Sequence, residues 1–202
     1  YYFCRMLQYL VSGSNAQEII TTATNALNNG CRWIRLDLRE LDAQQLKTTV
    51  KSLQEKCNEL DAFLSLEDDV ENVAAMKVAG VHLGLDSKIN AVDARKQLQE
   101  EPIIGVTVAE ASDVPFVPRN AIDYIATMGD DIDNCRKVVE QMRATGLEEP
   151  VVAPYSQATP LKKLMASGIN GMAVHHSTTP TDLLPQLLKE LNDMVEKRLE
   201  GL

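Results

Sequence analysis

Acidic side chains follow several short apolar segments of this chain, and their types and spacing could do chemistry. Each segment has the length and β-branched composition of a buried strand, and the acidic residues come at or just past its end. Carboxylate oxygens are the ligands that Mg²⁺ prefers. Gathered on one face, they would suit a metal ion or a cationic ligand. The residues concerned are Asp37, Glu67, Asp68, Asp86, Asp130 and Asp131.

Three histidines add a second kind of candidate group. His175 and His176 end another apolar segment, and imidazoles can bind metal or act as acid and base near neutral pH. Neighbouring residues on a strand point to opposite sides, so we expect only one of the two to face a site. A polar turn is the favoured alternative for this pair. We expect His82, inside a strand, to be a packed histidine with a backbone partner.

Eight apolar, β-branched segments alternate with segments of helical periodicity, which is typical of a parallel sheet covered by helices. The predicted strands are Met6–Val11, Cys31–Leu38, Ala62–Leu66, Val81–Leu83, Ile103–Val108, Ile122–Thr127, Val151–Ala153 and Met172–His175. Eight units favour a closed (β/α)8 TIM barrel, formed by residues 1–202 as a single domain with 1–5 as an N-terminal extension. A doubly wound open sheet competes, but no GxGxxG motif follows the first strand.

Start and stop signals place the helices between these strands. Ser14 and Gln17 form a capping box, and Gly30 ends that helix. Pro115 and Pro118 argue against a full helix over 111–120. The other expected helices run from about Asp42 to Leu60, up to Ala79, from a cap at Asn90 to Leu98, up to Thr145, from Pro160 to Gly168, and over 181–202.

Composition limits the classes of partner. The chain has 202 residues, of which 45% are apolar, and a formal net charge of −9. This charge disfavours nucleic acid and anionic membranes, and also phosphorylated ligands unless a local basic patch offsets it. The four cysteines, Cys4, Cys31, Cys57 and Cys135, form no CxxC pair. The last three are expected to be small core residues, which suggests a reducing, cytoplasmic setting.

Several stretches, in order, resemble one known family. Gly80–Gly84, Ala94–Arg95 and Ile103–Val106 are similar to segments of thiamine phosphate synthase and its TenI-type relatives. The matching set, which covers nearly the whole chain, continues with Trp33–Leu36, Asp68–Glu71, Ile122–Ile125, Pro150–Ala153 and Ala166–Val174. The resemblance implies the TIM-barrel fold.

The resemblance also implies a reaction and its partners. Family members join hydroxymethylpyrimidine diphosphate to a thiazole phosphate and release pyrophosphate with the help of Mg²⁺, while TenI-type relatives tautomerise a thiazole carboxylate phosphate. The implied partners are small phosphorylated thiamine precursors, and the implied assembly is a homodimer. Function must still be argued at the site, because one fold hosts many activities.

At the second strand the family has Gln, Arg and Lys, where this chain has Arg35, Asp37 and Arg39. The resemblance implies a partly kept anion site. An Arg-Asp-Arg ion-pair network that plugs the barrel is the favoured alternative, because Asp37 would compete with phosphate.

Two positions carry the implied magnesium site. Glu67 and Asp68 stand where the family has Asn-Asp, so Asp68 could serve as a ligand. Alternatively, Asp68, Asp69 and Glu71 are acids of the first helical turn that complement the helix dipole. After the fourth strand Ser87 occupies the position of the second ligand, and Asp86 lies one residue early.

Phosphate-binding positions of the family are altered in the later loops. Thr107 matches a family hydroxyl that contacts phosphate, but threonine is also a common strand residue. After the sixth strand, Met128–Asp133 supplies carboxylates that repel phosphate, and these could instead cap a helix. After the seventh strand, Pro154, Tyr155 and Ser156 replace a Gly-Gly-Ile run whose amides bind phosphate. The implied substrate-binding candidates are Arg35, Asp37, Arg39, Glu67, Thr107, Tyr155, Ser156 and His175.

Three hypotheses remain open. The first is a thiamine phosphate synthase or thiazole tautomerase that is active. The second, which the altered loops favour, is a homologue with impaired or lost transferase activity that acts as a binding or regulatory module. The third is a barrel enzyme of changed chemistry with an acidic, metal-binding mouth.

Overall fold

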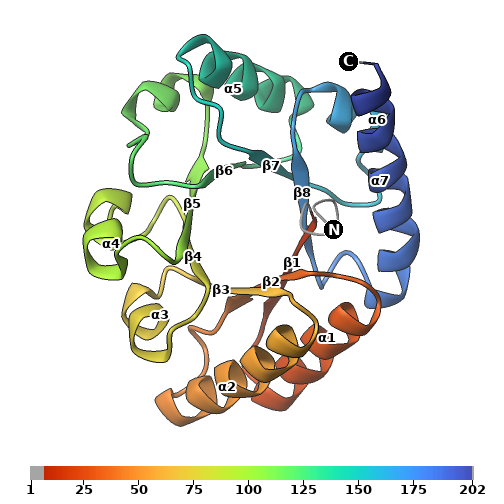
Figure 1. The fold of residues 1–202 in the computed structure, drawn as a ribbon. Coiled ribbons are helices and arrows are strands. Elements are labelled where there is room, and N and C mark those ends of the chain that lie inside the picture. The colour runs from red at the N-terminus through yellow and green to blue at the C-terminus, as the bar shows by residue number, and fades with distance from the viewer. Residues whose placement is uncertain (1–6, 202) are drawn as a thin grey trace. The chain divides into compact units, whose positions relative to one another are not determined.

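Eight strands in chain order form a closed parallel barrel in the computed structural model, which describes residues 7–201 (Figure 1). The strands are β1 Leu7–Ser12, β2 Trp33–Asp37, β3 Phe63–Glu67, β4 Gly80–Leu83, β5 Ile103–Val108, β6 Tyr124–Thr127, β7 Val151–Pro154 and β8 Gly171–His175. This confirms the (β/α)8 TIM barrel expected from the alternating pattern. The predicted first-strand residue Met6, the extension 1–5 and Cys4 lie outside the described residues.

Helices connect successive strands, with a 3₁₀ helix in place of an α-helix after β5. The α-helices are α1 Ala16–Asn28, α2 Ala43–Glu59, α3 Val70–Met76, α4 Ala91–Leu98, α5 Ile132–Ala144, α6 Leu161–Ala166 and α7 Leu184–Glu200. The 3₁₀ segments are η2 Ala111–Phe116 and η3 Thr181–Leu183. Pro115 lies inside η2, so the expected interruption of a full helix is confirmed.

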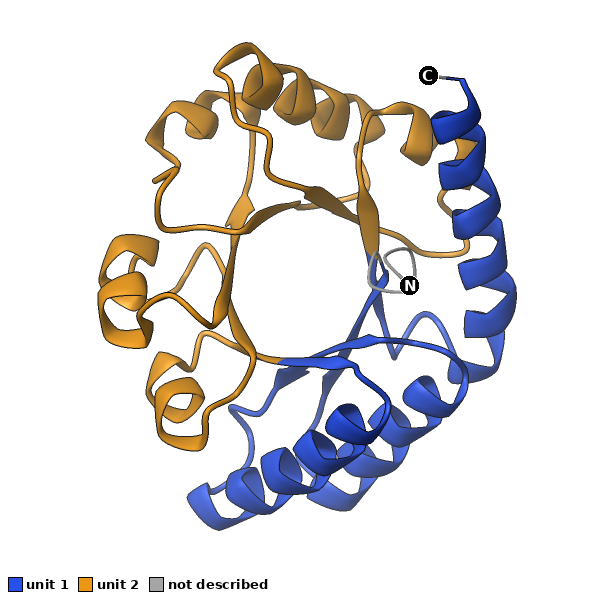
Figure 2. Ribbon diagram, viewed as in Figure 1, with its two compact units in different colours: residues 1–64, 173–202 blue, residues 65–172 orange. Residues whose placement is uncertain are grey.

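The chain divides into two compact units, coloured separately in Figure 2. Unit 1 comprises residues 1–64 and 173–202, and unit 2 comprises residues 65–172. Within each unit the helices lie on the outer side of the strands (Figure 2). Alternate strand residues therefore pack beneath helices and form the core, such as Ile34 and Leu36 in unit 1 and Ile104 and Ile125 in unit 2.

The start of α1 differs from the sequence prediction. Asn15, and not Ser14, is the N-cap, and its side-chain oxygen accepts the Glu18 amide at 3.0 Å. Both residue types cap helices well, and the choice between neighbours depends on where the loop from β1 turns into the helix. The cap at Asn90 is confirmed, and Asp42 forms a capping box with Gln45.

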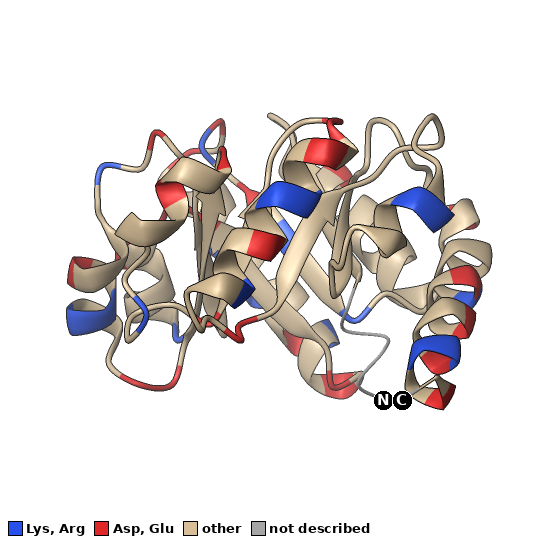
Figure 3. Ribbon diagram, turned by 90° about the horizontal axis from the view of Figure 1, so that it is seen from above, with Lys and Arg blue, Asp and Glu red and all other residues tan. Residues whose placement is uncertain are grey.

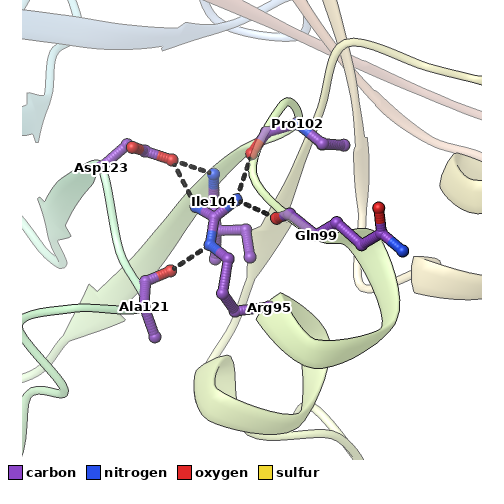
Figure 4. A network of polar contacts seen from close by, with 6 residues as sticks. All are labelled: Arg95, Gln99, Pro102, Ile104, Ala121 and Asp123. Atoms are coloured by element: carbon purple, nitrogen blue, oxygen red, sulfur yellow. Dashed lines mark hydrogen bonds and ion pairs between the residues drawn. The ribbon is translucent and has the colours of Figure 1, made fainter.

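Arginine side chains fasten the loops that precede the later strands. In unit 2, Arg95 near the end of α4 donates to the carbonyls of Gln99, Pro102 and Ala121 and pairs with Asp123 at 2.7 Å (Figure 4). The same Asp123 oxygen accepts the Ile104 amide at 2.8 Å. The contact fixes the starts of β5 and β6 relative to α4.

The same arrangement recurs one pair of strands later. Arg143 near the end of α5 donates to the carbonyls of Leu147 and Glu149 and to the Asn170 side chain. Asn170 Oδ1 also accepts the Val151 amide at 2.9 Å, as Asp123 does for Ile104. The resembling stretches Ile122–Ile125 and Ala166–Val174 thus hold strand starts in place.

Three of the four cysteines are free and buried in the described part of the chain: Cys31, Cys57 and Cys135. The prediction that they are small core residues is confirmed. Burial raises the pKa of the Cys31 and Cys57 thiols to about 12, so these thiols stay protonated.

Charged residues lie along the helices and loops, and both acidic and basic residues occur on α7 (Figure 3). Within residues 7–201, no helix combines the length and apolar character needed to cross a membrane.

Candidate functional site

Asp68, the predicted metal ligand, ties the loop after β3 to the loop after β4. Its Oδ1 accepts the Gly84 amide at 2.8 Å, and its own amide donates to the His82 carbonyl at 2.8 Å. The residue has φ +60°, in the left-handed region that few non-glycine residues adopt. Such conformations persist where neighbouring contacts enforce them, as they do here. The neighbouring candidate Glu67 ends β3 opposite His82 of β4.

Asp86 and Ser87, which stand at or beside the second metal position implied by the resemblance, follow β4. Asp86 lies in an exposed turn, and the Ser87 hydroxyl donates to the Ile89 carbonyl at 3.0 Å. Over the residues that the structure describes, no cluster of three or more His, Cys, Asp or Glu side chains could hold a metal ion. Because Mg²⁺ is often held by one or two carboxylates together with water and substrate phosphates, magnesium stays a prediction from the resemblance.

His82 lies at the centre of a buried polar chain in unit 2. Its Nδ1 is 2.7 Å from the Tyr124 hydroxyl, and its Nε2 is 2.8 Å from Thr107 Oγ1. The expectation of a packed histidine is confirmed, and the ring contacts side chains on β5 and β6. Thr107, the predicted phosphate contact, thereby has its hydroxyl committed to His82.

Gly105 leaves room for the hydrogen bond between Tyr124 and His82. A Cβ added at position 105 would overlap the Tyr124 ring, so only glycine lets the tyrosine reach inward to His82. The resembling stretches on β4, β5 and β6 thus meet at one buried feature. Tyr124 is a functional candidate that the sequence reading missed, although a tyrosine in an apolar strand was a visible signal.

Two of the acidic residues after β6 make contacts within the helix that follows, α5. Asp131 is the N-cap of α5 and accepts the Asn134 amide at 3.2 Å. Asp133 pairs with Arg136 and Lys137, and these hydrogen bonds lower the pKa of its carboxyl. Asp131 therefore caps the helix, as the alternative expected. Asp130 is exposed and lies before the cap.

The loop after β7 closes on itself. Pro154 ends the strand, and the Ser156 amide donates to Thr159 Oγ1 at 3.3 Å while the Thr159 amide donates to the Ser156 carbonyl at 2.9 Å. Proline has no N–H to offer. Of the predicted substrate contacts Tyr155 and Ser156, the second has its amide engaged within the loop.

In unit 1, Arg35 and Asp37 lie on β2, and Arg39 follows it. Arg35 is buried, 5% exposed, and donates to Gln8 Oε1 on β1 at 2.9 Å. Asp37 pairs with Arg39 at 2.8 Å, and the Arg39 side chain is 67% exposed. The Asp37–Arg39 part of the expected ion-pair network is present. The Asp37 carboxylate is therefore paired with Arg39, one of the two cations expected to bind an anion.

His175 at the end of β8 lies between two hydroxyl groups. Its Nε2 is 3.4 Å from Ser12 Oγ, and its Nδ1 is 2.6 Å from Ser177 Oγ and accepts the Ser177 amide at 3.1 Å. Burial and the charge of His176 lower the pKa of His175, while Asp37 acts in the opposite direction.

The two adjacent histidines do not separate as strand alternation predicted. Their ring centroids are 4.6 Å apart, because β8 ends at His175 and His176 already lies in a turn. Ser12 and Gln8 are further residues that the sequence reading missed. Both are polar side chains in an otherwise apolar strand, which was the signal available.

Comparison with known proteins places these observations in a family. Residues 8–129 match the family model described as thiamine monophosphate synthase. Two similar curated proteins are thiamine-phosphate synthases. The one from Bacteroides fragilis is 29% identical and aligns over 83% of this chain and 89% of its own length. The one from Flavobacterium psychrophilum is 26% identical and aligns over 92% of this chain and 97% of its own length.

Solved structures share the fold. Thiamine phosphate pyrophosphorylase from Pyrococcus furiosus superposes with a TM-score of 0.78 at 19% identity and covers 98% of both chains. Orotidine 5'-phosphate decarboxylase from Pyrococcus horikoshii superposes with a TM-score of 0.65 at 11% identity, over 95% of this chain and 99% of its own. At these identities the likeness concerns the barrel alone.

Proposed function

The chain belongs to the thiamine monophosphate synthase family, and we propose that it is a member without transferase activity that acts as a binding or regulatory module. The matched region covers residues 8–129 and therefore the strands from β1 to β6. The departures that motivate the proposal lie in the loops after β6 and β7.

The main support for the proposal is the loop after β7. A phosphate held by backbone amides needs consecutive free N–H groups that point into one concave space. Here Pro154 supplies none, and the Ser156 amide is taken by Thr159. Removing one such donor from an active site costs about a hundredfold in rate or more.

Two further features support the same reading. The carboxylates after β6 stand where the family resemblance implies a phosphate cradle, and they serve the N-terminus of α5 through Asp131 and the ion pairs of Asp133. In unit 1, Arg39 is paired with Asp37. A phosphorylated ligand would have to displace this pair as well as overcome the net charge of −9.

An assay for product formation tests the proposal. The purified chain is incubated with hydroxymethylpyrimidine diphosphate, thiazole phosphate and Mg²⁺, and thiamine phosphate is measured by chromatography. The thiamine-phosphate synthase of Bacteroides fragilis serves as the positive control. We expect turnover about a hundredfold or more below that control; turnover within a few-fold of it would refute the loss of activity.

An active synthase is the second candidate. It is favoured by the 29% identity to the Bacteroides fragilis synthase over 83% of this chain. The hypothesis of an acidic, metal-binding mouth has less support, because Asp68 is bonded to the Gly84 amide and Asp131 caps a helix. The same assay separates these candidates, since an active synthase forms thiamine phosphate, whereas a barrel enzyme of changed chemistry does not.

A further inference from the structure

A pocket of about 380 Å³ lies in unit 1, beside the strand-end contacts of His175 described above, and shares Ser12 with them. It is bounded by the end of β1, the first two turns of α1 and His176 after β8. Small-molecule sites usually start at about 300 Å³, so the pocket has room for a single-ring ligand. All of its walls belong to one compact unit.

The charge of the lining is one-sided. Glu18 is the carboxylate in it, and among the described lining residues none is Lys or Arg. Hydroxyl groups of Ser12, Thr21 and Thr22 add oxygen atoms that accept hydrogen bonds. Ile19 closes the pocket on the side of the core, where it is buried at 2% exposure.

The N-terminus of α1 does not reverse this preference. A helix N-terminus carries about half a positive charge, whereas the Glu18 carboxylate carries a full negative one. The backbone amide of Glu18, in the first turn of α1, donates to the Asn15 side chain at 3.0 Å and is therefore not open to an anion. The net charge of −9 adds to the attraction for cations.

We propose that this pocket binds a small organic cation, an amine or amidinium, whose N–H groups pair with Glu18 and with the neighbouring hydroxyls. The site adjoins His175, one of the substrate-binding positions that the family resemblance implies. It does not depend on whether the transferase activity is lost.

A titration with benzamidine tests the site. Benzamidine carries an amidinium on one ring, and benzamide is a neutral molecule of almost the same shape. We expect benzamidine to shift the backbone amide NMR signals of Ser12, Glu18, Thr22 and His176, and to bind about fivefold more tightly than benzamide. Equal affinity for the two compounds, or shifts located elsewhere, would overturn the proposal.

Variants identify the carboxylate. Glu18→Gln should weaken benzamidine binding about fivefold and leave benzamide binding unchanged. Glu55→Gln is the matched control, because Glu55 is an exposed glutamate on α2 in the same unit and lies outside the pocket lining. An equal loss in both variants would mean that only overall charge matters, and the site would be rejected.

A filling variant locates the ligand independently of charge. Thr22→Phe places a ring in the pocket from a half-buried position on α1. We expect it to abolish binding of both compounds, with a thermal unfolding midpoint that shows a folded protein. Undiminished benzamidine binding by folded Thr22→Phe would place the cation elsewhere and reject the site.

Discussion

The hydrogen bonds around His175 decide which of its nitrogens carries the proton. A backbone amide can only donate, so the bond from the Ser177 amide leaves Nδ1 without a hydrogen. The neutral ring then bears its hydrogen on Nε2, which faces Ser12 Oγ at 3.4 Å. His175 is therefore a hydrogen-bond donor toward β1 and not a base toward Ser12.

The pKa of His175 is the first testable quantity. We expect a pKa below the ordinary 6.5, because burial and then the charge of His176 disfavour the imidazolium. His176→Asn should raise this pKa, whereas Asp37→Asn should lower it further by removing an attractive charge. An NMR titration of the imidazole carbon-bound protons measures both changes, and a pKa unmoved by either variant would contradict the account.

The same shift has a consequence for stability. The folded state binds the His175 proton less readily than the unfolded state, so protonation favours unfolding. The contribution is fully present above the unfolded pKa of 6.5 and is lost as pH falls toward the lower, folded value. The slope of this loss should be smaller in His175→Gln than in the parent chain.

At the scale of elements, the arginine contacts hold neighbouring strands in place. Arg95→Met removes three bonds to carbonyls and the pair with Asp123, whose Oδ2 must then serve the Ile104 amide alone. The Arg95 side chain is 19% exposed, so screening by water is limited. We expect the free energy of unfolding to fall by about 2 kcal/mol.

A surface residue of the same helix provides the comparison. Lys96 is 75% exposed and lies 3.7 Å from Asp93, an arrangement that contributes little. Lys96→Met should change the free energy of unfolding by less than about 0.5 kcal/mol in urea denaturation. Similar losses for the two variants would mean that the Arg95 contacts are not what stabilises this region.

The start of α1 is a second prediction at this scale. Asn15→Ala should cost about 1 kcal/mol, because it removes the acceptor for the Glu18 amide. Ser14→Ala should cost much less, since Ser14 precedes the cap. Urea denaturation of both variants distinguishes the observed cap from the one expected in the sequence, and a larger loss for Ser14→Ala would reverse the assignment.

At the scale of the whole molecule, the net charge of −9 determines how the protein should respond to anions. We expect no rise in the thermal unfolding midpoint with pyrophosphate, because a ligand stabilises a fold only when it binds the folded state. Thiazole phosphate should behave likewise. A rise with pyrophosphate alone, absent with sulfate at equal ionic strength, would contradict the reading of the loops after β6 and β7.

Much of the fold could be predicted because its signals are local. Alternating apolar strands, helical periodicity, the cap at Asn90 and the prolines of η2 depend on residues close together in the chain. The boundaries were less well predicted, as at β2, which is shorter than Cys31–Leu38, and at α7, which is preceded by η3. Strand ends depend on pairing with neighbours, which no local pattern contains.

The roles of the candidate residues could be predicted only in part. The residue types already indicated that Pro154 offers no amide and that acidic residues replace a phosphate loop. The pair of Asp37 with Arg39, two residues apart, was expected as part of an ion-pair network. That His82 joins Tyr124 to Thr107 and that Asp68 holds Gly84 emerged only from the folded chain. The physical reason is that a backbone pattern is set within a few residues, whereas a side chain's partner is set by which distant segment the closed sheet brings within hydrogen-bonding reach.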